Sequence, residues 1–116
     1  MSDELVRRSS IEKWNRLDKL VPDIMSSWRK FYKSVMEPGH LDPKTKELIM
    51  IAVMHAKGCP WCIDTHVRKA RRLGATAEEI AEAAATAALI MSGSTLMHHI
   101  VAAEAQDWMA ENEPAK

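Results

Sequence analysis

Apolar residues recur at every third or fourth position along most of the chain, which is the spacing of one face of an α-helix. The pattern predicts helices over about 11–21, 22–36, 43–57, 60–73, 77–91 and 95–111. No stretch alternates apolar and polar residues as a half-buried strand does, and no internal repeat is present. The sequence therefore predicts an all-α fold of about five to six helices, in one domain over 1–116 with its core at about 22–111.

Residues that cap helices mark the ends of these segments. The expected starts are at Ser9 and Ser10, at Asp42 before Pro43, and at Thr76 with Glu79 three positions later. Gly58 and Gly74 follow two of the helices, where a left-handed residue often ends the last turn. The run Ser92-Gly93-Ser94 is expected to break or kink the chain before the last helix.

Both cysteines lie in one short stretch, Gly58–His66. Because proline is favoured at the first position of a helix, Pro60 makes Cys59 the expected N-cap and places Cys62 in the first turn. A thiol there faces unpaired N–H groups, so its thiolate is favoured. His66 follows one turn later on the same face, and a base beside a thiol activates it as a nucleophile. These residues predict a dithiol redox site.

Glu47 is an acidic residue on the mostly apolar helix that precedes the cysteines. A one- or two-residue connection makes that helix a spatial neighbour of the cysteine helix. The carboxylate is therefore either a solvated edge of the helix or a buried functional acid. The sequence alone leaves both readings open.

A Cys-x-x-Cys pair also occurs in proteins where it is not redox-active. Covalent haem attachment needs histidine directly after the second cysteine, and Ile63 stands there. A structural zinc site needs about four ligands. The further candidates are histidines at no recognised spacing: His40, His55, His66, His98 and His99. Inert buried cysteines are the third alternative.

Charge and composition narrow the class of partner. The formal net charge is zero, so no basic field invites nucleic acid. No apolar run follows the charged N-terminus, and the stretch Ala83–Met91 is too short to cross a bilayer. We therefore expect a cytoplasmic protein with no membrane or nucleic-acid partner.

The spacing Glu47-x11-Cys59-x2-Cys62-x3-His66 is followed by Gly-Ala-Thr-Ala-Glu-Glu-Ile at 74–80. Over about 41–101, this pattern resembles the AhpD-like alkylhydroperoxidases of the carboxymuconolactone decarboxylase superfamily. The resemblance implies an all-helical homotrimer or homohexamer that needs no haem, flavin or other cofactor.

The resemblance also implies a role for each site residue. Cys62 matches the thiolate that attacks a hydroperoxide, and Cys59 matches the resolving thiol. His66 and Glu47 match the acid/base relay that deprotonates Cys62. An external dithiol, in some members a protein-bound dihydrolipoyl group, would then reduce the disulfide.

One position departs from the family pattern, and two questions stay open. Trp61 stands where well-studied peroxidase members carry a histidine. Cap geometry alone favours Cys59 as the attacker in disulfide exchange, whereas the spacing to His66 favours Cys62 for peroxide. The alternatives to a dithiol enzyme are a zinc-binding or non-enzymatic helical assembly, and a decarboxylase or lactonase with incidental thiols.

Overall fold

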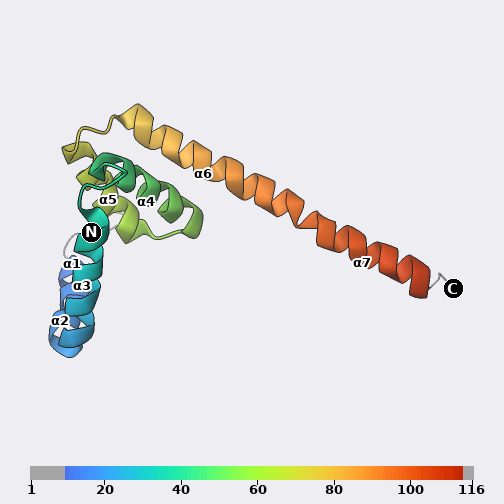
Figure 1. Cartoon of the computed structure of the whole chain (residues 1–116), viewed down its shortest axis with the longest axis horizontal. Helices are drawn as coiled ribbons and strands as arrows, with labels where there is room; N and C mark the ends of the chain where they lie inside the picture. Colours follow the sequence, from blue (N-terminus) through green and yellow to red (C-terminus); the bar gives the residue numbers. More distant parts are fainter. Residues whose placement is uncertain (1–9, 114–116) are drawn as a thin grey trace, which may run out of the picture.

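The structure, a computed structural model, describes residues 10–113, and every regular element in that range is a helix. The elements are α1 (Ile11–Asn15), α2 (Leu17–Leu20), α3 (Pro22–Met36), α4 (Pro43–Lys57), α5 (Pro60–Arg72), α6 (Ala77–Met97) and α7 (His99–Asn112). Figure 1 shows three parts: a column made by α1 to α3, a compact centre with α4 and α5, and a long arm made by α6 and α7. The predicted all-α class is confirmed.

The first predicted helix is divided in two. α1 and α2 meet at Arg16, and Val21 then leaves the helical conformation with a φ of −138°. Proline disfavours a helical conformation in the residue before it, which explains why α2 ends at Leu20 and Val21 is not helical. Ser10 precedes α1 without a side-chain cap, and Ser9 lies outside the described residues.

The predicted ends of α4 and α5 are confirmed. The Asp42 carboxylate accepts a hydrogen bond from the backbone N–H of Thr45 at 2.7 Å, with Pro43 at the first helical position. Gly58 and Gly74 have φ values of +82° and +91°, the left-handed conformation that only glycine adopts readily. The turn at Gly58 places α5 directly against α4.

The core lies between α4, α5 and the start of α6. Ile51, Ala70 and Ala75 are buried together there, and they pack against partly buried Leu48, Val67 and Ile80. Alanine at two of the three central positions allows the helix backbones to approach closely. This small cluster fixes α5 against α4, which is the pair of helices that carries the predicted site residues.

The predicted break at Ser92-Gly93-Ser94 is wrong. α6 continues through these residues to Met97, and the chain breaks instead at His98. The hydroxyls of Ser92 and Thr95 donate to the carbonyls of Leu89 and Met91 inside the same helix. Neither hydroxyl therefore bonds to the backbone in a way that would end the helix. Gly93 costs the helix some stability but does not end it.

As a result, the arm is longer than expected. By length and composition alone, Ala77–Asn112 is long and apolar enough to cross a membrane, with a mean hydropathy of 1.4 in its best window and 6% of that window buried. The apolar stretch was expected to end at Met91 because a break was predicted at Ser92–Ser94, and the helix has no break there. Length and composition are weak evidence for a membrane span, since helices that pack in soluble proteins pass the same test.

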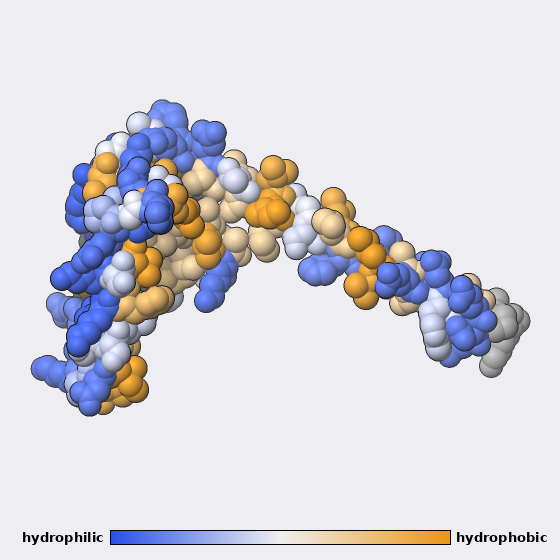
Figure 2. Space-filling model, viewed as in Figure 1, coloured by the Kyte–Doolittle hydropathy of each residue, from blue (hydrophilic) through white to orange (hydrophobic). Residues whose placement is uncertain are grey.

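The arm gives the molecule an open shape. The radius of gyration is 20.8 Å, whereas a compact chain of this length has about 13 Å. Figure 2 shows patches of apolar side chains along the arm, which extends away from the centre without folding back. Its most exposed apolar residues include Leu89, Ile90, Leu96, Met97 and Val101.

Candidate dithiol site

The two cysteines lie at the N-terminus of α5 and form a disulfide. Cys59 is the N-cap, as predicted, and its Sγ accepts a hydrogen bond from the backbone N–H of Cys62 at 3.3 Å. Pro60 occupies the first turn between them. The structure therefore shows the oxidised form of the pair, with both sulfurs at the positive end of a helix, where a thiolate is favoured after reduction.

Glu47 and His66 are brought together across the α4–α5 contact. Glu47 Oε2 lies 2.6 Å from His66 Nδ1, and the two side chains are 2% and 12% exposed. Glu47 is thus a buried acid and not a solvated edge of α4. With Nδ1 engaged by the carboxylate, Nε2 is the histidine nitrogen that remains to exchange a proton with a thiol.

The α4–α5 turn explains this meeting of residues 19 positions apart. The backbone N–H groups of Gly58 and Cys59 both donate to the Met54 carbonyl, at 2.8 and 3.2 Å, which closes the end of α4. The chain then reverses within two residues and starts α5. His66 falls one turn after Cys62, so the helix surface that carries the thiol also meets α4.

α3 contributes a residue that the sequence did not identify as part of the site. The Tyr32 ring stacks on the His66 imidazole, with centroids 6.4 Å apart and planes at 27°. The Lys69 ammonium donates a hydrogen bond to the Tyr32 hydroxyl at 2.6 Å. In the sequence, Tyr32 is one of several apolar positions on α3, and no spacing relates it to residues on α5.

Hydrogen bonds from a lysine on α4 hold the end of α3 against α4. Lys46 Nζ donates to the carbonyls of Val35 and Glu37 at 2.6 and 2.7 Å. These carbonyls belong to the last turn of α3 and to the residue after it. The contact holds α3, and with it Tyr32, beside the helix that carries Glu47.

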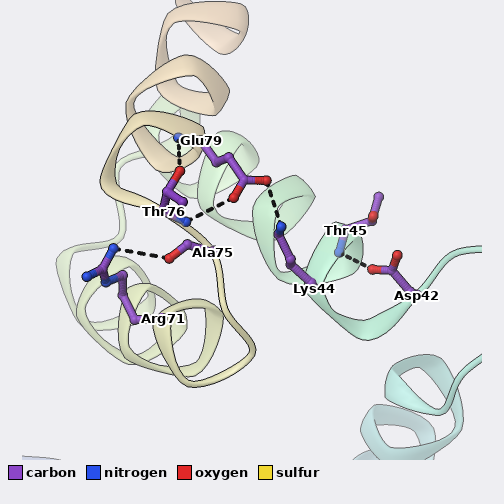
Figure 3. A network of polar contacts seen from close by, with 7 residues as sticks. All are labelled: Asp42, Lys44, Thr45, Arg71, Ala75, Thr76 and Glu79. Carbon is purple, nitrogen blue, oxygen red and sulfur yellow. Dashed lines mark hydrogen bonds and ion pairs between the residues drawn. The ribbon is translucent and has the colours of Figure 1, made fainter.

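A polar network connects α4 to the start of α6 (Figure 3). The Glu79 carboxylate accepts from Lys44 Nζ at 2.8 Å and from the backbone N–H of Thr76 at 3.0 Å, and the Thr76 hydroxyl accepts from the Glu79 N–H. The predicted capping box is therefore confirmed. The Lys44 ammonium, followed by the Thr76 N–H, holds the pKa of Glu79 below its ordinary value.

The other histidines considered as zinc ligands do not gather around the thiols. Within residues 10–113, no three His, Cys, Asp or Glu side chains form a group suited to a metal ion. His55 Nδ1 lies 2.8 Å from the Ile51 carbonyl of its own helix, and His98 lies at the break between α6 and α7. The zinc hypothesis gains no support from the described residues.

Trp61, which lies between the two cysteines, is 55% exposed. It lies next to Cys62 in the first turn of α5 and makes no ring contact with Tyr32 or His66. Trp61 is therefore not a core residue of the described structure.

The fold and the site define an all-α protein with a cysteine pair at a helix N-terminus and, one turn along that helix, a histidine paired with a buried glutamate. Residues 22–105 match the sequence profile of the carboxymuconolactone decarboxylase family. The chain belongs to this family, which confirms the resemblance to its AhpD-like members.

The relatives that match this chain include proteins that carry no assigned activity. The chain is 50% identical over 66 residues to "Uncharacterized protein 4 in cox locus" of Paracoccus denitrificans, and 36% identical over 66 residues to an uncharacterized protein of Cupriavidus necator. These alignments cover 57% of the chain and only 60% and 58% of the two relatives. The chain therefore matches somewhat over half the length of each.

Solved structures share the fold over more of the chain. A protein from Methanobacterium thermoautotrophicum superposes with a TM-score of 0.71 at 34% identity, covering 75% of this chain and 95% of the other. A carboxymuconolactone decarboxylase family protein from Legionella pneumophila, solved in its apo form, gives 0.69 at 34% identity, covering 84% and 88%. A protein from Thermotoga maritima gives 0.61 at 29% identity, covering 91% and 99%.

Proposed function

We propose that the protein is a cofactor-free dithiol oxidoreductase that reduces hydroperoxides, or disulfides, through a cycle between two thiols and the Cys59–Cys62 disulfide. The proposal is supported above all by the buried Glu47–His66 pair. Its nitrogen and oxygen are 2.6 Å apart, and it lies one helical turn from Cys62. A carboxylate that orients a histidine beside a thiol is the arrangement that activates a cysteine nucleophile.

In the oxidative half of the cycle, His66 accepts the proton of the Cys62 thiol, and the thiolate attacks the terminal oxygen of a hydroperoxide. The O–O bond breaks, the alkoxide leaves as an alcohol after protonation, and Cys62 becomes a sulfenic acid. The Cys59 thiol then attacks the Cys62 sulfur and releases water. The pair, whose Cα atoms are 5.3 Å apart in the disulfide, has lost two electrons and the peroxide has gained them.

In the reductive half, an external dithiol attacks the disulfide and forms a mixed disulfide with one cysteine. Its second thiol then displaces that cysteine, so the external dithiol is oxidised and both protein thiols return. Exposed Trp61 beside the disulfide is a suitable contact for such a reductant. A protein-bound dihydrolipoyl group is the reductant that the family resemblance favours.

The proposal is tested by counting thiols on fully reduced, metal-free protein before and after one equivalent of an organic hydroperoxide. We expect rapid loss of both thiols and a decrease of two hydrogens in intact mass. A protein in which both cysteines are replaced by serine is the control for non-specific oxidation. Persistence of both thiols would refute the peroxidase reaction. In that case, we would measure whether the protein catalyses the reduction of a small disulfide by an external dithiol. Catalysis would identify a disulfide reductase, and its absence would leave neither activity.

We also propose that the protein assembles as a homotrimer or homohexamer. The chain exposes 9456 Å², whereas a compact monomer of this mass exposes roughly 6,400 Å². The difference exceeds the approximately 800 Å² that each partner buries in an ordinary stable interface. The apolar residues along α6 and α7, with Leu89 at 73% exposed, supply the surface for such a contact.

Light scattering after size-exclusion chromatography tests the assembly. We expect three or six copies in the wild-type protein, and a smaller species when Leu89→Glu places a charge on the apolar arm. Gln106→Glu adds the same charge at a polar position of α7 and should leave the assembly intact. A wild-type monomer would overturn the oligomer proposal without affecting the thiol count described above.

A further inference from the structure

We propose that Tyr32 is a positioning residue of the dithiol site: its ring holds the His66 imidazole in the orientation that joins Nδ1 to Glu47 and leaves Nε2 for the thiols. This inference rests on the proposed dithiol function, because it assigns a task to α3 in the acid/base step. Tyr32 does not contact a substrate in this role and acts only through His66.

The first argument is the geometry around the imidazole. The hydrogen bond to Glu47 holds the imidazole at one edge, through Nδ1, and makes no contact with either face of the ring. The Tyr32 ring lies over the imidazole at an interplanar angle of 27°, with the centroids 6.4 Å apart, and limits how far the imidazole can tilt toward α3. The two contacts act in perpendicular directions, so together they define where Nε2 points.

The second argument is that Tyr32 is itself held in place by the helix that carries His66. Lys69 follows His66 by three positions on α5 and donates to the Tyr32 hydroxyl at 2.6 Å, with its nitrogen 4.8 Å from the ring centroid. Tyr32 on α3 therefore contacts α5 twice, at His66 through its ring and at Lys69 through its hydroxyl. A phenylalanine would make the first contact and not the second.

The third argument is the support behind Tyr32. Trp28 contacts the Tyr32 ring with centroids 5.5 Å apart, and Trp14 packs edge-on against Trp28 at 5.4 Å. Trp28 is therefore the aromatic residue that directly supports Tyr32, and Trp14 lies one ring further from the imidazole. Lys46 fixes the last turn of α3 to α4 at the same end of the helix.

The test measures the rate of thiol alkylation by iodoacetamide against pH in the fully reduced protein. Tyr32→Leu should move the midpoint of the profile upward by about one pH unit. Near neutral pH, the reaction should be about threefold slower, because a tenfold loss of thiolate is partly offset by the greater nucleophilicity of a more basic thiolate. Tyr32→Phe keeps the stacked ring and should stay within about twofold of the wild type.

Two further variants make the result specific. His66→Ala should shift the midpoint at least as far as Tyr32→Leu. Trp14→Leu removes the aromatic ring that lies beyond Trp28 and should leave the midpoint unchanged, whatever it does to thermal stability. A shift in both His66→Ala and Tyr32→Leu, with none in Trp14→Leu, supports the inference.

The contrary outcomes separate two failures. A shift in His66→Ala without one in Tyr32→Leu would overturn the role of Tyr32 and leave the proposed function intact. No shift in His66→Ala would refute the acid/base pair itself, and the role of Tyr32 with it. If Tyr32→Leu does not fold, Tyr32→Met removes the ring while filling its space with a flexible apolar chain, and Tyr32→Phe is its control. Equal midpoints in these two variants would also overturn the inference.

Discussion

Glu47 on α4 and His66 on α5 form a hydrogen-bonded pair, with Oε2 and Nδ1 2.6 Å apart. The Glu47 side chain is 2% exposed, so its carboxylate has almost no water to solvate it. A buried charge without a partner is strongly destabilising, whereas a partnered one is tolerated. The pair therefore links the stability of the α4–α5 contact to the group that we propose as the base.

This link predicts how the pair responds to mutation. His66→Ala leaves the Glu47 carboxylate buried and unpaired, and we expect a loss of about 3 kcal/mol in the free energy of unfolding near neutral pH. Glu47→Gln removes the charge but keeps a hydrogen-bonding amide, so we expect a loss of about 1 kcal/mol. Urea denaturation of both single variants and of the double variant measures the coupling.

The double variant should lose less than the sum of the two single variants, because the unpaired carboxylate is then absent. His55→Ala, on the exposed side of the same α4–α5 turn, is the control and should change stability by less than about 0.5 kcal/mol. Strictly additive losses would mean that Glu47 and His66 do not interact in solution.

Much of this site follows from local sequence. The N-cap at Cys59, the proline after it and the glycine before it are short-range features, and each fixes a backbone conformation within a few residues. The one-turn spacing from Cys62 to His66 follows from helix geometry alone. These elements therefore appear in the structure where the sequence predicted them.

The parts that the sequence left open depend on contacts between distant residues. Whether Glu47 is buried depends on what α5 places against it, and its own neighbours in sequence do not decide this. Tyr32 reaches His66 only because α3 lies beside α5. The break expected at Ser92–Ser94 failed for a different reason: one glycine and two serines cost a helix some stability but need not end it, and α6 continues through them to Met97.

The two cysteines should yield different products when each is replaced. Cys62→Ser removes the proposed peroxide-attacking thiol, so hydroperoxide should leave Cys59 reduced. Cys59→Ser should still react at Cys62 but stop at the sulfenic acid, since no thiol is present to form the disulfide. Trapping with dimedone followed by intact-mass measurement distinguishes the two. Sulfenic acid found only in Cys62→Ser would reverse the assignment of the attacking and resolving thiols.

The glycines predict opposite effects of the same substitution. Gly93 has a helical backbone, and no side chain beyond its two chain neighbours lies within 4 Å of the position that a Cβ would occupy, so Gly93→Ala should stabilise the protein by about 0.5–1 kcal/mol. Gly74 has equal space but a φ of +91°, so Gly74→Ala should destabilise by about 1–2 kcal/mol through backbone strain alone. Denaturant titrations measure both. Destabilisation by Gly93→Ala would indicate that α6 is interrupted there after all.

Glu79 makes the contact between α4 and α6 sensitive to acid. Its pKa in the folded protein lies below the ordinary value of 4.5, chiefly because of the Lys44 ammonium and then the Thr76 N–H. A folded-state pKa that is lowered in this way gives stability above the unfolded value, and this stability is lost as pH falls through the folded one. The stabilising effect of Glu79 should therefore be complete near neutral pH and disappear at pH values below 4.5.

Glu79→Gln isolates this effect, because the amide oxygen of glutamine still accepts from the Thr76 N–H and only the ion pair with Lys44 is lost. We expect the wild type to melt at a higher temperature than Glu79→Gln near neutral pH, and the two melting temperatures to converge as pH falls below 4.5. Asp42, whose pKa is also lowered by the Thr45 N–H, is present in both proteins and cancels in the difference. Glu78→Gln removes an acid from the same turn without breaking a contact to Lys44, so its melting temperature should differ less from that of the wild type. If the difference in melting temperature between wild type and Glu79→Gln does not change with pH, the Lys44–Glu79 ion pair does not stabilise the α4–α6 contact.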